Sequence, residues 1–180
     1  MRSIFLSFPA LTLFASLAHA ENAITFSPAL PKPWAQISSQ VVPGTNAVSQ
    51  TPITANITVV QNTTNLQSMM ISVIPLASPE ATNHLADDAR NWLQSILNGI
   101  HESHVVQVTQ FEPKSGKKQQ VVGAAFTLQL QDTMLCGISR YSIVKTNAIA
   151  WVAFGPDPSI ESNKVVMGIA ASIRVRSMPR

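Results

Sequence analysis

Apolar residues recur at helical spacing in one long segment near the middle of the chain. Between Leu85 and Ile100 they fall three and four positions apart, which is the pattern of a helix with one buried stripe. The stripe consists of Leu85, Ala89, Trp92, Leu93, Ile96, Leu97 and Ile100. Ser78 and Pro79 predict the start of this helix. Gly99 predicts its end, since glycine tolerates the left-handed conformation there.

β-Rich runs stand on both sides of this helix. The runs 53–61 and 66–76 precede it and are joined by the polar sequence NTTN, which is typical of a hairpin turn. Four runs with short connections follow the helix, at 104–112, 119–131, 134–145 and 148–155. Within 121–130 every second residue is apolar, so one face of that strand is expected to be buried. The four later runs therefore predict an antiparallel meander.

The remaining segments carry turn and capping residues. Residues 21–40 form a short extended segment interrupted by prolines, which confine any strand there to a sheet edge. Residues 41–52 are turn-rich and are expected to form a loop. Near the C-terminus, Asp157 and Pro158 predict the start of a second amphipathic helix. Its expected apolar stripe is Ile160, Val165, Val166, Ile169, Ala170 and Ile173.

This order of elements indicates the fold class. A meander has apolar faces that must be covered, and two amphipathic helices are the elements available to cover them. We therefore predict an α+β sandwich in which a mostly antiparallel sheet packs against both helices. The length of the chain favours a single domain, which we place at residues 21–180.

The first twenty residues, MRSIFLSFPALTLFASLAHA, have the pattern of an export signal. A basic residue, Arg2, precedes an apolar run from Ile4 to Leu17, and Ala18-His19-Ala20 matches the small-x-small cleavage pattern. The apolar run is shorter than the roughly 20 residues that a membrane-spanning helix needs. We expect cleavage after Ala20; the alternative is an N-terminal membrane anchor.

Cysteine content and charge restrict the compartment and the partners. The chain has a single cysteine, Cys136, so no internal disulfide can form, which favours a Gram-negative periplasmic protein over a disulfide-stabilised secreted module. The formal charge of +3 is close to balanced. The basic clusters around Lys117 and Arg176 lack interleaved aromatic residues, so no nucleic-acid partner is expected. No second apolar run is long enough to span a bilayer.

The sequence HESH at 101–104 is the most conspicuous group of metal-binding residue types. A helical zinc site of the H-E-x-x-H type places its two histidines four residues apart, whereas His101 and His104 are three apart and follow Gly99. If the segment is extended, the two side chains point to opposite faces. A further ligand would have to come from a distant residue such as His84. We therefore interpret HESH as a boundary between helix and strand, and we predict no metal site and no cofactor.

Other candidate chemistry is weak. Cys136 lies in the apolar run TMLCGISRY without a neighbouring histidine in the sequence, so a buried, inert thiol is expected. The chain has no nucleophile elbow, no phosphate-binding loop and no dinucleotide fingerprint. We predict that the protein is not an enzyme.

Trp34 is the candidate partner-binding residue. It follows three prolines at positions 28, 31 and 33, and an aromatic side chain beside a rigid segment can anchor a partner. The alternative is that Trp34 is buried and pins its loop to the sheet.

Several segments resemble the Mog1/PsbP-like family, which includes DcrB-like periplasmic proteins. FSPALPKPW at 26–34 is similar to the family's opening strand, and 121–158 is similar to its central meander running into the last helix. IAASIRV at 169–175 resembles its closing helix, although the Ser-aromatic pair common there is missing, since Ile173 follows Ser172. The resemblance covers nearly all of 21–180 and implies a non-catalytic binding or accessory domain.

Two functions remain open at this point. The first is a periplasmic accessory domain that binds a protein of the cell envelope. The second is a small-molecule or metal binder, or a hydrolase, that uses a groove between sheet and helix with His101, His104 or Cys136. The sequence favours the first.

Overall fold

The computed structural model describes residues 22–45, 52–65, 67–76, 85–100, 103–116, 119–144 and 146–177. The predicted export signal and the first two residues of HESH lie outside these ranges, as do Ser78 and Pro79.

A seven-stranded sheet forms the centre of the molecule, with the strand order β2-β3-β4-β8-β7-β6-β5 and every neighbouring pair antiparallel. Its strands are β2 (Trp34–Thr45), β3 (Pro52–Asn62), β4 (Ser68–Pro75), β5 (Ser103–Gly116), β6 (Gln119–Leu130), β7 (Thr133–Val144) and β8 (Asn147–Gly155). The chain passes from β4 to the far edge at β5 and returns strand by strand until β8 pairs with β4. The predicted meander is therefore confirmed, and so is the α+β class with a mostly antiparallel sheet.

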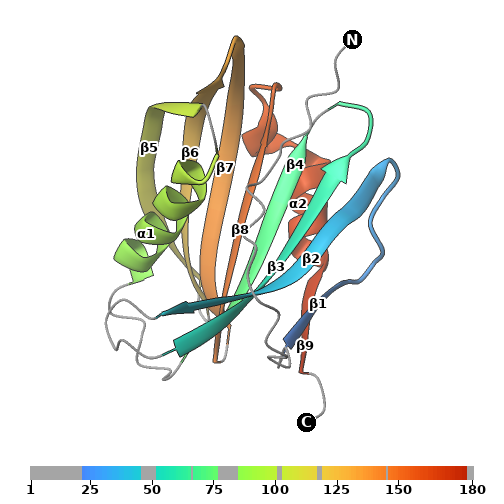
Figure 1. Cartoon of the computed structure of the whole chain (residues 1–180), viewed down its shortest axis with the longest axis vertical. Coiled ribbons are helices and arrows are strands. Elements are labelled where there is room, and N and C mark those ends of the chain that lie inside the picture. The colour runs from blue at the N-terminus through green and yellow to red at the C-terminus, as the bar shows by residue number, and fades with distance from the viewer. Residues whose placement is uncertain are drawn as a thin grey trace.

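The sheet is the middle of three layers (Figure 1). Helix α1 (Leu85–Asn98) lies on one face. Helix α2 (Lys164–Ser172) lies on the other, beside a two-stranded ribbon of β1 (Asn22–Phe26) and β9 (Ile173–Ser177). Each face of the sheet thus has its own apolar core.

The α1 layer follows from the two periodicities in the sequence. Leu85, Ala89, Leu93 and Leu97 are buried on one side of the helix, while alternate residues of β6 face them from the sheet. The residues packed in this layer include Val122, Ala124, Phe126, Leu128, Leu135, Ala148, Ala150 and Val152. Trp92 and Ile96, predicted as part of the stripe, are only half-buried at its margins.

The α2 layer buries the opposite sides of β3, β4, β7 and β8. Its core consists of Trp34, Val60, Met69, Ile71, Ile138, Trp151, Ala153, Ile160, Val166 and Ile169. The ribbon is tied to the end of α2, because the Ser27 amide donates to the Ser172 carbonyl at 2.8 Å. Ile24 and Phe26 of β1 pack at the edge of the same core.

The C-terminal helix begins later than predicted. A 3-10 turn, η2 (Ile160–Ser162), comes first, and Asn163 then caps α2 by accepting from the amides of Val165 and Val166 at 3.0 and 3.1 Å. The predicted cap, Asp157, instead accepts from the Ser159 amide and hydroxyl at 2.8 and 2.7 Å. These two hydrogen bonds lower the pKa of the Asp157 carboxyl.

Two further predictions of local structure were wrong. Residues 41–45 continue β2 instead of forming a loop, with Pro43 tolerated because β2 is the edge strand of the sheet. The helix α1 does end next to Gly99, but no described glycine has a positive φ, so the left-handed cap is absent there.

Candidate functional site

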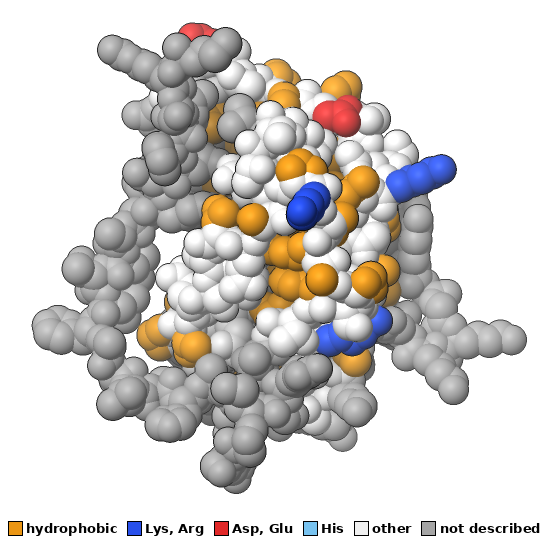
Figure 2. All heavy atoms as spheres, turned by 90° about the vertical axis from the view of Figure 1, so that its right-hand side faces the viewer, with side chains coloured by type: hydrophobic (Ala, Val, Ile, Leu, Met, Phe, Trp, Pro, Cys, Tyr) orange, Lys and Arg blue, Asp and Glu red, His pale blue; other side chains and the backbone are white. Residues whose placement is uncertain are grey.

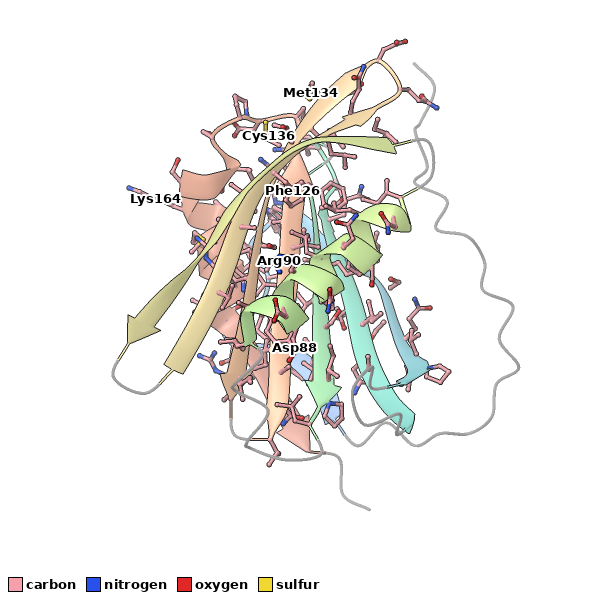
Figure 3. All side chains as sticks on the ribbon, turned by 90° about the vertical axis from the view of Figure 1, so that its left-hand side faces the viewer. Asp88, Arg90, Phe126, Met134, Cys136 and Lys164 are labelled. Carbon is pink, nitrogen blue, oxygen red and sulfur yellow. The ribbon has the colours of Figure 1, made fainter. Side chains whose placement is uncertain are left out.

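The interface between α1 and the sheet is filled by apolar side chains in the part that the structure describes. Leu93 and Leu97 of the helix pack on the same cluster as Phe126, whose own exposed fraction is 3 %. Phe126 pairs in register with Gly137, and its ring occupies the space above that glycine where a side chain would stand. Figure 3 shows Phe126 between α1 and the strands. Around Leu93, Leu97 and Phe126 this interface is therefore hydrophobic core.

Cys136 lies away from α1. It follows Leu135 on β7 and packs against the apolar cluster of the α2 layer, where it is half-buried. The thiol was predicted to be buried, and it is only half-buried. Its register partners are Thr127 on β6 and Gly155 on β8, so neither neighbouring strand places a base directly opposite the thiol.

The HESH sequence does bridge a helix and a strand, since α1 ends at Asn98 and β5 begins at Ser103. His101, Glu102 and His84 lie outside the described residues. The backbone of His104 pairs with that of Gln129 at the edge of the sheet. Among the residues that the structure describes, no group of three histidine, cysteine or carboxylate side chains could hold a metal ion.

Trp34 is buried, with an exposed fraction of 6 %. Its ring belongs to the core of the α2 layer together with Val60 and Ile160. Its amide donates to the Pro31 carbonyl at 2.8 Å, and the Thr63 amide donates to the Pro33 carbonyl at 3.2 Å. This burial agrees with the alternative that the Trp34 ring holds its loop against the sheet. It leaves the side chain little exposed surface for the predicted contact with a partner.

Tyr141 is a buried phenol beneath α1. Its exposed fraction is 5 %, and its ring meets Trp92 edge-on with 6.4 Å between the centroids. Burial raises the pKa of Tyr141 to about 12, with a smaller contribution from the negative charge of Asp88. This environment favours the neutral phenol over the phenolate.

The chain contains a single tyrosine, so tyrosinate absorbance reports Tyr141 alone. We expect the folded protein to titrate near pH 12, and the protein unfolded in denaturant to titrate near pH 10. Because the unfolded state loses the proton first, the free energy of unfolding should fall as pH rises through this interval. Tyr141→Phe should remove this contribution to the pH dependence. A midpoint near pH 10 in the folded protein would contradict the burial.

Two of the four large apolar side chains that are exposed among the described residues are on α2. Among the described residues they are Ile37 on β2 at 53 %, Met134 on β7 at 48 %, and Val165 and Met167 on α2 at 46 % and 38 %. Val165 was predicted to face the core. Val166, Ile169 and Ser172 are buried in α2, whereas Val165, in the first turn of the helix, is 46 % exposed.

The exposed side of α2 carries apolar and small residues. We call it the α2 outer face and define it by Val165, Met167, Gly168 and Ala171, all of which are exposed. At 100° per residue, Met167, Ala171, Lys164 and Gly168 follow one another around this side, and Val165 lies next to Gly168 at the margin of the buried side. A Cβ built on Gly168 would have no atom within 4 Å.

Two cationic side chains belong to this region. Lys164, the first residue of α2, is exposed and at 100° per residue projects between Gly168 and Ala171. Arg174 follows the end of the helix, where its Nη1 donates to the carbonyls of Ala171 and Ile173, both at 2.8 Å. Figure 2 looks onto the side of the molecule where β1, β2, α2 and β9 lie, and shows hydrophobic side chains in a band with Lys and Arg side chains within it and beside it.

No protein-family model matches the chain, and no curated protein matches it. No helix among the described residues is long and apolar enough to cross a membrane.

Proposed function

We propose that the protein is an exported, non-catalytic accessory domain that binds a protein of the cell envelope in the periplasm of a Gram-negative bacterium. The observation that carries this proposal is the apolar surface of α2, where Val165 and Met167 are 46 % and 38 % exposed on a helix that is capped and packed on its other side. Apolar surface held on a rigid element is typical of protein-binding sites.

Two features of the sequence support the compartment and the class. The segment 1–20 has the pattern of a cleaved export signal. The segments at 26–34 and 121–158 resemble the Mog1/PsbP-like family, and we propose that the chain is a member. In the structure, Ser172 is buried at the end of α2, where the family's closing pair would begin, and Ile173 starts β9.

The proposal predicts one dominant partner in the envelope. A C-terminally tagged protein is expressed from the full chain, crosslinked in intact cells and purified from the periplasm, and its partners are identified by mass spectrometry. We expect the mature protein to start at Glu21. We also expect it to be crosslinked to one envelope protein, recovered in much larger amount than with an unrelated exported control protein. Recovery of the protein with no partner above that control would contradict the proposal. So would a protein that keeps residues 1–20 and stays in the cytoplasm.

A further inference from the structure

We infer that the protein forms a symmetric dimer in which strand β2 pairs, antiparallel, with β2 of a second copy, and that the twofold axis passes at Gln40. This inference is independent of the proposed function and concerns a different surface. It is carried by the backbone directions of one edge strand, by its lack of charge and by the position of a proline.

β2 forms one edge of the seven-stranded sheet (Figure 1). Among the described residues, no strand pairs with its outer side, and the side chains from Ala35 to Gln40 are all exposed. An edge strand presents a row of backbone N–H and C=O groups that pair with another extended chain. The occupant that this edge selects is therefore a β-strand.

The pairing of β3 shows which backbone groups of β2 face outward. The Asn62 amide donates to the Gln67 carbonyl at 2.9 Å, so Asn62 directs its backbone groups toward β4. Backbone direction alternates from residue to residue along a regular strand, and the register between β3 and β4 is regular. Ile57 therefore directs its groups the opposite way, toward β2, where its register partner is Gln40.

Ser39 and Val41, the neighbours of Gln40, consequently direct their N–H and C=O groups away from the sheet. Pro43 belongs to the same outward set, where its missing N–H costs no hydrogen bond to β3. The position of this proline thus agrees with the direction deduced from β3. Each copy offers the N–H and C=O of Ser39 and of Val41 to another strand.

A second copy satisfies all of these groups at once. In an antiparallel pair, opposite residues exchange two hydrogen bonds when their backbone groups face each other. With the twofold axis at Gln40, Ser39 lies opposite Val41 of the second copy, and Val41 lies opposite Ser39 of the second copy. The same axis brings the exposed Pro43 near Ile37 of the second copy, whose side chain is 53 % exposed. Apolar contacts then close both ends of the paired segment.

The charge of the two sheet edges favours this closed pairing. Trp34–Thr45 contains no charged residue, so the twofold axis brings no like charges together. The other edge strand, β5, contains Glu112 and Lys114 and has two register shifts, which are features that hinder pairing between sheet edges. Pairing of β2 with β2 is complete with two copies, whereas pairing of β2 with β5 would continue into a filament.

Sedimentation velocity of the purified exported protein over a dilution series should show an equilibrium between monomer and dimer. Val41→Pro should abolish the dimer, because it removes an amide donor of the interface from each copy. Its fold should persist, since the nitrogen of residue 41 faces away from β3. Met134→Lys, at an exposed position on β7, is the control and should dimerise like the wild type. Circular dichroism checks that both variants are folded.

Charge at Gln40 tests the position of the axis. Gln40→Lys places two lysines opposite each other and should weaken the dimer about tenfold or more. Gln40→Glu should weaken it in the same way, and an equal mixture of the two variants should form a heterodimer. Because Gln40 is exposed, neither substitution should unfold the protein.

A disulfide gives an independent test of the register in a Cys136→Ser background. Gln40 would face its own copy across a pair of about 4.5 Å between Cα atoms, a distance that a disulfide spans. Gln40→Cys should therefore form a covalent dimer when diamide is added. Ser38→Cys is the matched control on the same exposed strand, because its two copies would lie on the order of 14 Å apart.

Three results would overturn the inference. The first is a monomer at every concentration. The second is a dimer that Val41→Pro and Gln40→Lys leave unchanged, because the contact would then lie on another surface. The third is a covalent dimer from Ser38→Cys and none from Gln40→Cys, which would exclude an axis at Gln40. If a photo-crosslinking amino acid at position 40 captures a different protein in cells while the purified protein stays monomeric, the edge serves a foreign strand and the second copy is excluded.

Discussion

Val166→Asp should lower the free energy of unfolding by about 3–5 kcal/mol, which would leave much of the protein unfolded. Val166 has an exposed fraction of 0 % and lies in the apolar core of the α2 layer with Met69 and Ile169. A carboxylate at this position would lose its hydration, with only apolar side chains around it in that core.

Val165→Asp is the matched control for this prediction. The residue is a valine on the same turn of α2, but 46 % of it is exposed. We expect a change within about 0.5 kcal/mol, since the new carboxylate stays in water near the positive end of the helix. Both variants should be measured by urea denaturation followed by circular dichroism. Equal stability of the two variants would contradict the orientation of α2.

Gly137→Ala should lower the free energy of unfolding by about 1–3 kcal/mol, through overpacking rather than through backbone conformation. A methyl group on Gly137 would overlap the ring of Phe126, its register partner on β6. The ring is rigid and buried beneath α1, so neither group can move away without disturbing the core.

Two further variants separate overpacking from a general effect of substituting glycine. Gly168→Ala, where the added methyl meets nothing within 4 Å, should leave stability unchanged or raise it by up to about 1 kcal/mol. In the background of Phe126→Leu, Gly137→Ala should cost less than in the wild type, which a double-mutant cycle measures. Additive effects of the two substitutions would show that the ring does not limit the space at Gly137.

The sequence allowed prediction of elements whose contacts repeat along the chain. The helical stripe of α1 and the alternation in β6 both bury one face, and these periods appear in the order of residues. The meander was predictable because its strands are joined by short connections. The ribbon of β1 and β9 was not predictable from the sequence. It pairs residues 22–26 with residues 173–177, and no local pattern indicates such a distant pairing.

The candidate site was harder to predict for a related reason. Asp157-Pro158 has the residue types that begin a helix, but the chain forms a separate turn there and α2 starts at Lys164. In a helix of nine residues, apolar side chains stand on all sides, so the sequence alone could not show that Val165 is exposed while Val166 is buried. Trp34 was misjudged because the prolines before it do not indicate which side of the sheet its ring will reach.

Methionine oxidation in intact cells tests most directly the claim that the α2 outer face is covered by a partner. Met134 and Met167 are exposed to similar extents, whereas Met69 and Met70 are buried, so the described part of the chain provides two probes and two internal controls. Peroxide should oxidise Met134 and Met167 alike in the purified protein, and Met69 and Met70 far more slowly. The account predicts that in cells Met167 becomes several-fold less reactive while Met134 does not change. Equal oxidation of Met134 and Met167 in cells would contradict it.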